Sequence, residues 1–330
     1  MATRSLAVSR YQVSQLSFSL PSFAKINWSL QILGKRPDGY HEVRTILQTI
    51  SLHDDLDFEM SGDGAVVLSC NKPDIPTDDR NLIVRAAYAL KDRYSVDYGV
   101  RVRLNKRIPA KAGLGGASSN AGVALLALVQ LWQVEANLTS LSKIAAELGA
   151  DVPFFLLGGC ALATGTGATI APLPDLNSDT QHLIVIVPNA AVSTADAYAA
   201  VSSNALTTIN SDPILSSSRE EAISGNSVPW PPYRKLQNDF ESVIFDIEPE
   251  IRRAKETLLQ AGAFRALLAG SGSSVFGIFA DQEAQKSAIN EIQLEPGWRI
   301  FPCVTLSRNE YVSALDSCGT SVLRSFDLNI

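Results

Sequence analysis

The sequence predicts a protein of mixed strands and helices, organised as one large domain or as two. The chain has 330 residues, and a domain usually has about 100–200. Hydrophobic residues make up 46% of the chain and charged residues 19%, so we expect a substantial buried core. Strand-like alternation dominates up to about residue 108, and apolar helix-like runs follow it.

The most informative segment is residues 109–120, PAKAGLGGASSN. It follows a strand-like run at 100–106 and precedes an apolar helix-like run at 121–132. Its three glycines lack Cβ atoms, so a polyanion could approach the backbone closely. Unpaired N–H groups and the positive dipole end of the next helix would face that anion. The pattern predicts a phosphate-binding loop; the alternative is a tight turn with Ser118 or Ser119 capping the helix.

Two better-known nucleotide loops are excluded. The Walker A loop ends in Gly-Lys-Ser or Gly-Lys-Thr, whereas Lys111 precedes the glycines. The dinucleotide-binding fingerprint, G-x-G-x-x-G, needs a third glycine five residues after the first, where this chain has Ser118.

The N-terminal half contains strand candidates at 26–32 and 64–69. A helix is expected at 81–90, with Asp78 or Asp79 as its N-cap. Further helices are expected at 117–133 and 139–148.

A loose segment at 165–179 is the predicted domain boundary. Beyond it we expect a buried strand at 182–187 and a surface loop at 202–232, rich in Ser, Asn, Thr and Pro. Helices are expected near 234–245 and 248–261. A second glycine cluster, residues 269–274, then leads into a strand at 275–279.

Charge and composition exclude several classes of protein. The net charge of −6 argues against a sequence-independent nucleic-acid binder. The four cysteines form no C-x-x-C pair, so neither zinc nor a disulfide framework is indicated. We expect no membrane span, because no apolar run is long enough.

The first 20 residues carry Arg4, Arg10, five serines and no acid, and the first carboxylate is Asp38. We interpret residues 1–20 as a disordered extension of a cytoplasmic protein, with a plastid transit segment, and therefore the stroma, as the alternative. The expected assembly is a monomer or a weak homodimer.

Three segments together resemble the motifs of the GHMP kinase superfamily. They are residues 21–27, residues 109–120 and residues 268–274. Residues 36–41 (RPDGYH), 149–154 (GADVPF) and 237–241 (QNDFE) narrow the resemblance to the kinases of 4-diphosphocytidyl-2-C-methylerythritol. The likeness extends from about residue 21 to 310.

This resemblance implies a two-domain α+β fold. Residues 21–179 would form the N-terminal ATP-binding domain, and residues 180–330 a C-terminal domain with helices on an antiparallel sheet. It also implies an enzyme that uses ATP and Mg²⁺ to phosphorylate the 2-hydroxyl of the cytidine diphosphate-linked methylerythritol, in the non-mevalonate pathway to isopentenyl diphosphate.

Two residues are the expected catalytic pair. The resemblance assigns Asp151 to activation of the acceptor hydroxyl, with a turn or capping role as the alternative. Lys25 would bind the acceptor oxygen or neutralise charge on the γ-phosphate. The alternative, from the residue type and its place at a strand start alone, is a lysine exposed to solvent. Asn27 projects to the same strand face as Lys25 and would bind the same hydroxyl.

The resemblance also implies binding sites for both substrates. Tyr40 and His41 would stack on and hydrogen-bond the cytosine. Gly270, Ser271 and Gly272 would line the substrate diphosphate, and Asp239 is expected to be structural. The nucleotide residues would be Asn81, Lys106, Pro109, Ala110, Lys111, Ala112, Gly113, Leu114, Gly115, Gly116, Ala117, Ser118 and Ser119. Ser119 is also the candidate Mg²⁺ contact.

Two other interpretations stay open at this stage. The chain could be a GHMP-type kinase for mevalonate, homoserine or a sugar, although Tyr40-His41 and residues 149–153 argue against it. It could also be a ligand sensor with this fold and no turnover. The presence of both Lys25 and Asp151 counts against the sensor.

Overall fold

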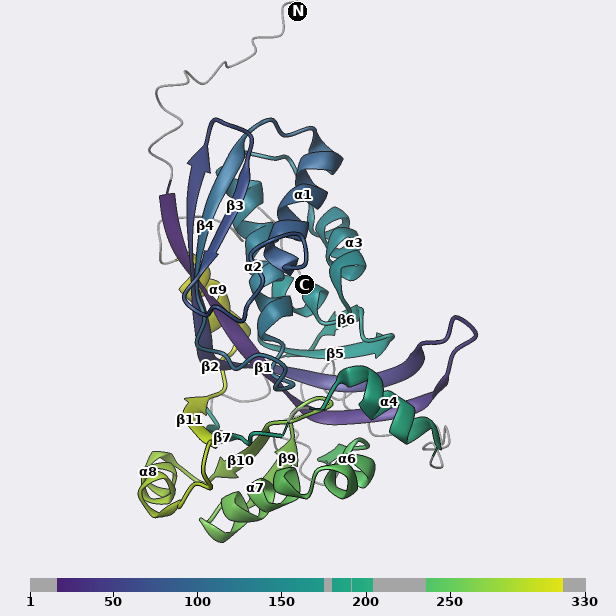
Figure 1. Ribbon diagram of the computed structural model, residues 1–330, viewed down its shortest axis with the longest axis vertical. Coiled ribbons are helices and arrows are strands. Elements are labelled where there is room, and N and C mark those ends of the chain that lie inside the picture. The colour runs from purple at the N-terminus through teal and green to yellow at the C-terminus, as the bar shows by residue number, and fades with distance from the viewer. Residues whose placement is uncertain (1–16, 175–179, 191, 204–235, 317–330) are drawn as a thin grey trace, which may run out of the picture.

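The computed structural model describes residues 17–174, 180–190, 192–203 and 236–316. Two bodies are joined by one long antiparallel hairpin, made of β1 (Ser17–Lys35) and β2 (His41–Ser61) (Figure 1). One end of the hairpin packs in the N-terminal body and the other reaches the C-terminal body.

The second half of β2 shows why this segment is a strand. Leu56, Phe58 and Met60 are buried, while Asp57 and Glu59 point to the other face. This two-residue period places every apolar side chain on the core side of the sheet.

The described part of the larger sheet has seven strands, in the order β3-β4-β2-β1-β8, with β5 beside β2 and β6 beside β5. Its other strands are β3 (Val66–Cys70), β4 (Gly99–Asn105), β5 (Cys160–Gly165), β6 (Thr169–Pro172) and β8 (Gln237–Asn238). Three helices and one short 3₁₀ helix follow in this body: α1 (Leu82–Tyr94), α2 (Gly116–Leu131), α3 (Leu138–Leu148) and η2 (Val152–Leu156).

Helix α2 is the centre of the N-terminal body. It is apolar almost all round and nearly every residue is buried, as expected of a helix covered on all sides. It packs against α1, α3, η2 and the hairpin, and therefore has a fixed position at the middle of the molecule.

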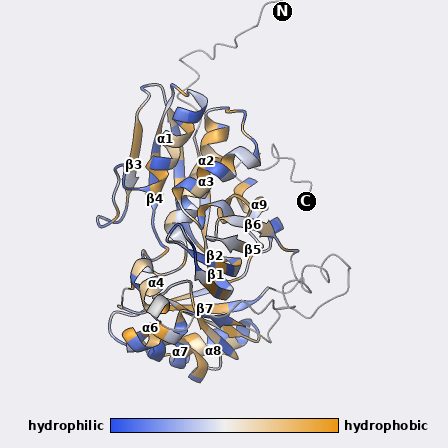
Figure 2. Cartoon of the chain, turned by 90° about the vertical axis from the view of Figure 1, so that its right-hand side faces the viewer, coloured by the Kyte–Doolittle hydropathy of each residue, from blue (hydrophilic) through white to orange (hydrophobic). Residues whose placement is uncertain are grey.

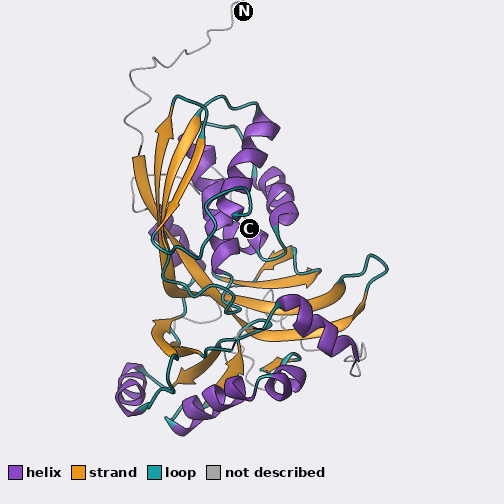
Figure 3. Cartoon of the chain, viewed as in Figure 1, coloured by secondary structure: helices purple, strands orange, loops and turns teal. Residues whose placement is uncertain are grey.

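The C-terminal body has an antiparallel sheet in the order β11-β7-β10-β9. Helices α6, α7 and α8 lie beyond the hairpin, on the side away from the N-terminal body, whereas α4 lies over the hairpin (Figures 1 and 3); Figure 2 shows hydrophilic and hydrophobic residues mixed on its helices. In α7, Ile251, Ala254 and Leu258 form the buried stripe of an amphipathic helix. The strands are β7 (His182–Val187), β9 (Arg265–Leu268), β10 (Val275–Phe279) and β11 (Arg299–Val304), and the helices are α4 (Thr194–Ser203), α6 (Glu241–Ile247), α7 (Pro249–Gln260) and α8 (Gln282–Glu291).

The two-domain α+β architecture is confirmed, but several element predictions are wrong. Strand β1 begins at Ser17 and Leu20 is buried, so the expected extension ends before residue 17; residues 1–16 lie outside the described ranges. The segment at 165–179 contains β6, which pairs with β5. The helix expected at 234–245 is instead β8 followed by α6. Most of the 202–232 loop lies outside the described residues.

The expected caps of α1 are also wrong. The N-cap is Asn81, whose side chain accepts a hydrogen bond from the Ile83 N–H at 2.9 Å. Asp78 instead binds Arg80 through its carboxylate. An amide side chain at the N-cap position itself reaches the free N–H groups of the first turn, which an acid two or three residues earlier does not.

Two elements cross the predicted boundary at 179/180. Strand β8 adds to the larger sheet beside β1, in parallel orientation. Helix α9 (Arg308–Asp316) returns to the N-terminal body, where Tyr311 and Leu315 are fully buried (Figure 1). The C-terminal segment therefore holds the two bodies together.

Candidate active site

A cavity of about 1160 Å³ lies where the two bodies meet. It is lined by the middle of the hairpin, the glycine loop before α2, residues 150–151, helix α4 and the second glycine cluster. Nearly all the site residues expected from the sequence line it: Lys25, Asn27, Tyr40, His41, Asn81, Lys106, Pro109, Ala110, Lys111, Ala112, Gly113, Leu114, Gly115, Gly116, Ala117, Ser118, Asp151, Gly270 and Ser271. Ser119 and Gly272 are not among its lining residues.

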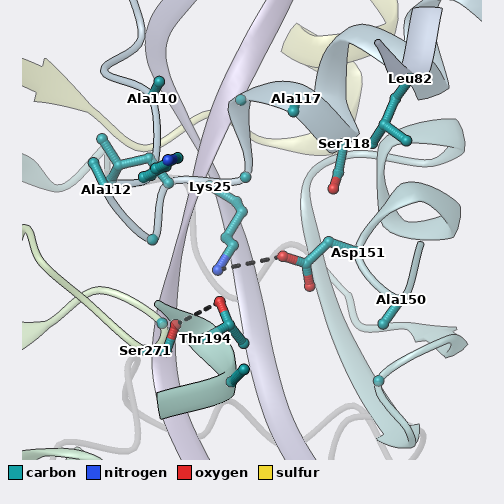
Figure 4. A pocket seen from close by; sticks show the side chains of 18 of the residues that line it. Lys25, Leu82, Ala110, Ala112, Ala117, Ser118, Ala150, Asp151, Thr194 and Ser271 are labelled. Carbon is teal, nitrogen blue, oxygen red and sulfur yellow. Dashed lines mark hydrogen bonds and ion pairs between the residues drawn. The ribbon is translucent and has the colours of Figure 1, made fainter. Parts of the chain in front are cut away.

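Lys25 and Asp151 face one another across this cavity (Figure 4). The distance from Lys25 Nζ to Asp151 Oδ2 is 3.6 Å, and the side chains are 5% and 37% exposed. Lys25 Nζ also donates to Asn27 Oδ1 at 2.9 Å, and Asn27 Nδ2 donates to Thr45 Oγ1 at 2.7 Å. The expectation that Lys25 and Asn27 share one strand face is confirmed. The ammonium is therefore held in place while the carboxylate stays open to a substrate.

Two glycines make room for Lys25. A Cβ on Gly115 would lie 2.9 Å from Lys25 Cγ, and one on Gly270 would lie 3.1 Å from Lys25 Nζ. Both glycines have positive φ, 70° and 58°, which L side chains rarely adopt. The glycine loop and the second glycine cluster thus close around the lysine from opposite sides.

The start of α2 excludes a capping role for the two serines. Its N-cap is Gly115 and no side chain caps it, so the alternative that Ser118 or Ser119 serves as the cap is wrong. The first intrahelical bond runs from the Ser119 N–H to the Gly115 carbonyl. The N–H groups of Gly116, Ala117 and Ser118 therefore have no acceptor within the helix.

The two serines have different surroundings. Ser118 lines the cavity, and in Figure 4 its side chain points towards the space near Asp151. Ser119 is fully buried, and its hydroxyl lies 2.7 Å from the Ser22 hydroxyl. This burial corrects the assignment of Ser119 as the metal contact, because its oxygen is turned into the core. One helical position, about 100° of rotation, separates an accessible hydroxyl from a buried one.

The two glycine segments pack directly on each other. A Cβ on Gly113 would lie 2.0 Å from the Ala269 carbonyl oxygen, and the Ser274 N–H donates to the Ala112 carbonyl at 3.2 Å. Asn238 in β8 fixes the second segment by donating to the carbonyls of Leu268 and Gly270, at 2.9 and 2.7 Å. Asp239 accepts from the Ile32 N–H at 2.8 Å, which agrees with its expected structural role.

The far end of the cavity is aromatic. Tyr40 is 66% exposed on the connection between β1 and β2. The His41 ring stacks on Tyr198 from α4 with centroids 4.7 Å apart, and Tyr198 in turn meets the edge of Phe240. Burial, followed by the charge of Asp151, raises the pKa of Tyr198 to about 12. Burial and the charge of Lys35 lower the pKa of His41. Both rings are therefore uncharged at neutral pH.

The cavity residues that the sequence analysis missed include Thr45, Arg80, Thr194 and Tyr198. Thr194 Oγ1 lies 3.1 Å from Ser271 Oγ, so α4 contacts the second glycine cluster (Figure 4). Helix α4 has a low polarity contrast, so no periodic pattern pointed to it. Arg80 lies directly before the Asn81 cap of α1, outside the motifs identified in the sequence.

The described residues contain no cluster of three or more His, Cys, Asp or Glu side chains suited to a metal ion. None of the described helices combines the length and the apolar character needed to cross a bilayer.

Family models match the chain in two places. The model of the GHMP kinases N terminal domain matches residues 81–159, and that of the GHMP kinases C terminal matches residues 222–296. The first match contains the glycine loop and Asp151. The second contains β8 and the second glycine cluster. The hairpin and α4, which also line the cavity, lie outside both matches.

Similar solved structures support the same fold. A crystal structure of 4-(cytidine 5'-diphospho)-2C-methyl-D-erythritol kinase has a TM-score of 0.69 at 31% identity, covering 87% of this chain and 98% of that one. Homoserine kinase from Cytophaga hutchinsonii has a TM-score of 0.61 at 19% identity, covering 93% and 98%. At that identity the likeness to the homoserine kinase concerns the fold alone.

Curated relatives narrow the family. The 4-diphosphocytidyl-2-C-methyl-D-erythritol kinase of Solibacter usitatus is 42% identical over 88% of this chain and 90% of the relative. That of Prosthecochloris aestuarii is 42% identical over 82% and 93%. With these identities over nearly full-length relatives, the chain belongs to the 4-diphosphocytidyl-2-C-methyl-D-erythritol kinase family of the GHMP kinases.

Proposed function

We propose that this protein transfers the γ-phosphoryl group of ATP to the 2-hydroxyl of 4-diphosphocytidyl-2-C-methyl-D-erythritol, giving the 2-phosphate and ADP. The observation that carries the proposal is the Lys25–Asp151 pair, 3.6 Å apart and facing a glycine loop at a helix N-terminus. The cavity of about 1160 Å³ exceeds the usual volume for one small ligand, about 300–1,000 Å³, and suits two substrates.

The reaction needs an acceptor oxygen and a proton acceptor in line with the γ-phosphorus. The Asp151 carboxylate takes the proton of the 2-hydroxyl as that oxygen bonds to phosphorus and the bond to the ADP oxygen breaks. Lys25, held by Asn27 at 2.9 Å, lies where it can stabilise the negative charge of the transferring group. A loose transition state demands little covalent help, so positioning of these groups matters as much as proton removal.

The start of α2 suits the phosphates of ATP. Gly113 and Gly115 keep Cβ atoms away from the loop, and the N–H groups of residues 116–118 have no intrahelical acceptor. Bound Mg²⁺ would neutralise phosphate charge. Because Mg²⁺ prefers oxygen ligands and keeps several waters, the accessible Ser118 hydroxyl fits this ion and the buried Ser119 hydroxyl does not.

The aromatic end of the cavity suits the cytosine. Tyr40 is exposed and free to stack on a planar base, and His41 and Tyr198 present uncharged rings with hydrogen-bonding groups. Tyr198 was absent from the sequence-based site and is added to it here.

The test is ADP release with Mg-ATP against four acceptors: 4-diphosphocytidyl-methylerythritol, mevalonate, homoserine and galactose. We expect turnover with the cytidylyl compound alone. Turnover with another acceptor would keep the phosphate site but remove the cytosine assignment. ATP binding without turnover on any acceptor would favour a ligand sensor, and Lys25 and Asp151 would then have no catalytic role.

The Tyr40→Ala variant tests the cytosine site separately. Because Tyr40 is 66% exposed, its loss should leave folding intact. Loss of a base-stacking ring worth about 1–3 kcal/mol should raise the KM of the cytidylyl substrate by about 5- to 150-fold. The KM for ATP should stay unchanged, and equal effects on both substrates would contradict the assignment.

A further inference from the structure

Asp54 on β2 is the one fully buried carboxylate among the described residues. It accepts four hydrogen bonds: from Lys106 Nζ at 2.5 Å, Asn120 Nδ2 at 2.9 Å, the Arg107 N–H at 2.7 Å and the Ile108 N–H at 2.8 Å. No part of the reaction described above uses it. A buried charge with this number of donors is nevertheless a specific arrangement.

Its partners all belong to the nucleotide side of the cavity. Lys106 is 7% exposed and lines the cavity together with Asn81 and Leu104. Residues 107 and 108 lead directly into the glycine loop. Asn120 lies one turn into α2. One carboxylate thus contacts the strand end, the loop start and the helix that the loop enters.

Lys106 is confined by this arrangement. Its ammonium also donates to Asn120 Oδ1 at 3.2 Å. A Cβ on Gly116, the first residue of α2, would lie 2.8 Å from Lys106 Nζ. The ammonium therefore sits against the first turn of the helix, and Asp54 determines that place.

A second set of hydrogen bonds ties the network to β1. Asn120 Nδ2 donates to Ser22 Oγ at 2.9 Å, and Ser22 Oγ lies 2.7 Å from Ser119 Oγ. All three side chains are buried. The hydroxyl of Ser119 thus has a structural partner in Ser22, which lies three residues before Lys25 on β1.

Burying an ion pair usually gains little stability, because the desolvation cost offsets the attraction. Two apolar side chains would fill the same space at no greater cost. What they could not do is hold a cation at the edge of an anion-binding cavity or fix two successive backbone N–H groups at the start of the loop. This difference indicates a role in positioning.

We propose that Asp54 is a positioning residue for the nucleotide: it fixes Lys106 and the start of the glycine loop so that both meet ATP in one geometry. The inference rests on the proposed ATP-binding function. It predicts that Asp54 affects nucleotide affinity and leaves the acceptor site unaffected, because Tyr40 and Tyr198 lie on other elements and His41 lies at the opposite end of β2.

The test compares Asp54→Asn with wild type by calorimetric titration with Mg-ADP and by steady-state kinetics. Asparagine keeps one oxygen for the two backbone N–H groups but sets an NH₂ group against Lys106 and Asn120. We expect the Kd for ADP and the KM for ATP to rise about tenfold or more, as an unpaired buried ammonium moves from its place, with the acceptor KM within about twofold.

Asp57→Asn is the matched control. Asp57 lies three residues further along β2, is paired with Arg103 at 2.7 Å and lies outside the cavity. Its substitution should leave all constants unchanged. A lowered melting temperature of Asp54→Asn with unchanged ADP affinity would reduce Asp54 to a structural residue and overturn the proposal. Equal rises in both KM values would overturn it too.

The double variant Asp54→Asn/Lys106→Met tests whether Asp54 acts through Lys106. If it does, the double variant should bind ADP no more weakly than whichever single variant has the lower ADP affinity. Fully multiplicative effects would contradict that route.

If Asp54→Asn fails to fold, Asn120→Ala serves in its place, because it removes one donor to Asp54 and keeps both charges. It should raise the Kd for ADP about threefold or more, and an unchanged Kd would overturn the proposal. If the wild-type protein binds ADP but turns over no acceptor, the proposed function is refuted. The role of Asp54 is then still tested by comparing the ADP affinity of the variant with that of wild type.

Discussion

At the residue scale, Lys25 and Asp151 face each other but differ in surroundings. Lys25 is enclosed by two glycines and held by Asn27, whereas more than a third of the Asp151 side chain is exposed to the cavity. A fixed cation and an accessible carboxylate suit different tasks. The cation stabilises charge at one place, and the carboxylate meets each new acceptor.

Asp151→Asn should keep the shape of the site and remove its base. We expect kcat to fall by about 10²–10⁴-fold, the usual contribution of a general base, with the KM for ATP little changed. Steady-state kinetics on the folded variant would measure this. Asp246→Asn, at an exposed carboxylate paired with Arg252 in the C-terminal body, is the control. Turnover like that of wild type would remove Asp151 from the mechanism.

His41 should give acceptor binding a pH dependence. Burial, and then Lys35, lower its pKa below the ordinary 6.5, so the imidazole is neutral at pH 7. Protonation of His41 is therefore unfavourable in the folded protein and disfavours the stacking of its neutral ring on Tyr198. The acceptor KM should be flat between about pH 7 and 8 and should rise as the pH falls below 6.5 through the lowered pKa. His41→Gln should remove this rise, and a rise that persists in the variant would assign it elsewhere.

At the element scale, the glycine loop depends on what packs behind it. Its conformation is maintained by contacts with the second glycine cluster, some 150 residues later in the chain, and by Asp54 on β2. A loop between a strand and a helix could adopt several turns. These long-range contacts select the one in which the helix N-terminus opens into the cavity.

Gly115→Ala should damage this element directly. The new Cβ would lie 2.9 Å from both Lys25 Cγ and Phe155 Cζ, at a φ of 70°. We expect a loss of about 1–3 kcal/mol in the free energy of unfolding, from strain and overpacking, and a lower kcat as Lys25 shifts. Denaturant titration and kinetics would measure both. Gly62→Ala, where no atom lies within 4 Å, is the control and should have no effect on kcat.

At the scale of the whole molecule, the last described helix ties the ends of the chain together. Tyr311 in α9 is fully buried in the N-terminal body. Its ring is tilted against that of Phe23 with centroids 5.8 Å apart, and its hydroxyl donates to the Phe155 carbonyl at 2.5 Å. Phe155 follows Asp151 by one turn of η2. The C-terminal helix therefore supports the segment that carries the expected base.

Tyr311→Ala should destabilise the protein by about 3–5 kcal/mol, as other large aromatic truncations in cores do. Denaturant titration would show this as a lower midpoint. Tyr311→Phe should lose only about 1–3 kcal/mol, because packing is kept and one carbonyl loses its donor. Tyr88→Ala, on an exposed face of α1, is the control. A loss no larger than that of the control would show that α9 is not part of the core.

The sequence by itself determined the features that are local in the chain. Glycine spacing before an apolar run predicted the loop and α2, and strand alternation placed Lys25 and Asn27 on one face. Such features depend on neighbouring residues, so a pattern of a few positions is enough to predict them.

Only the tertiary structure decided which of these features meet. Ser118 faces the cavity and Ser119 the core because α2 is oriented by packing on all sides. Tyr198 reaches His41 because α4 folds back over the hairpin. Asp54 reaches Lys106 because β2 pairs with β4, which ends directly before Lys106. These contacts join residues 52 to 157 positions apart. Their geometry depends on packing energies summed over the whole core, which no short pattern in the sequence expresses.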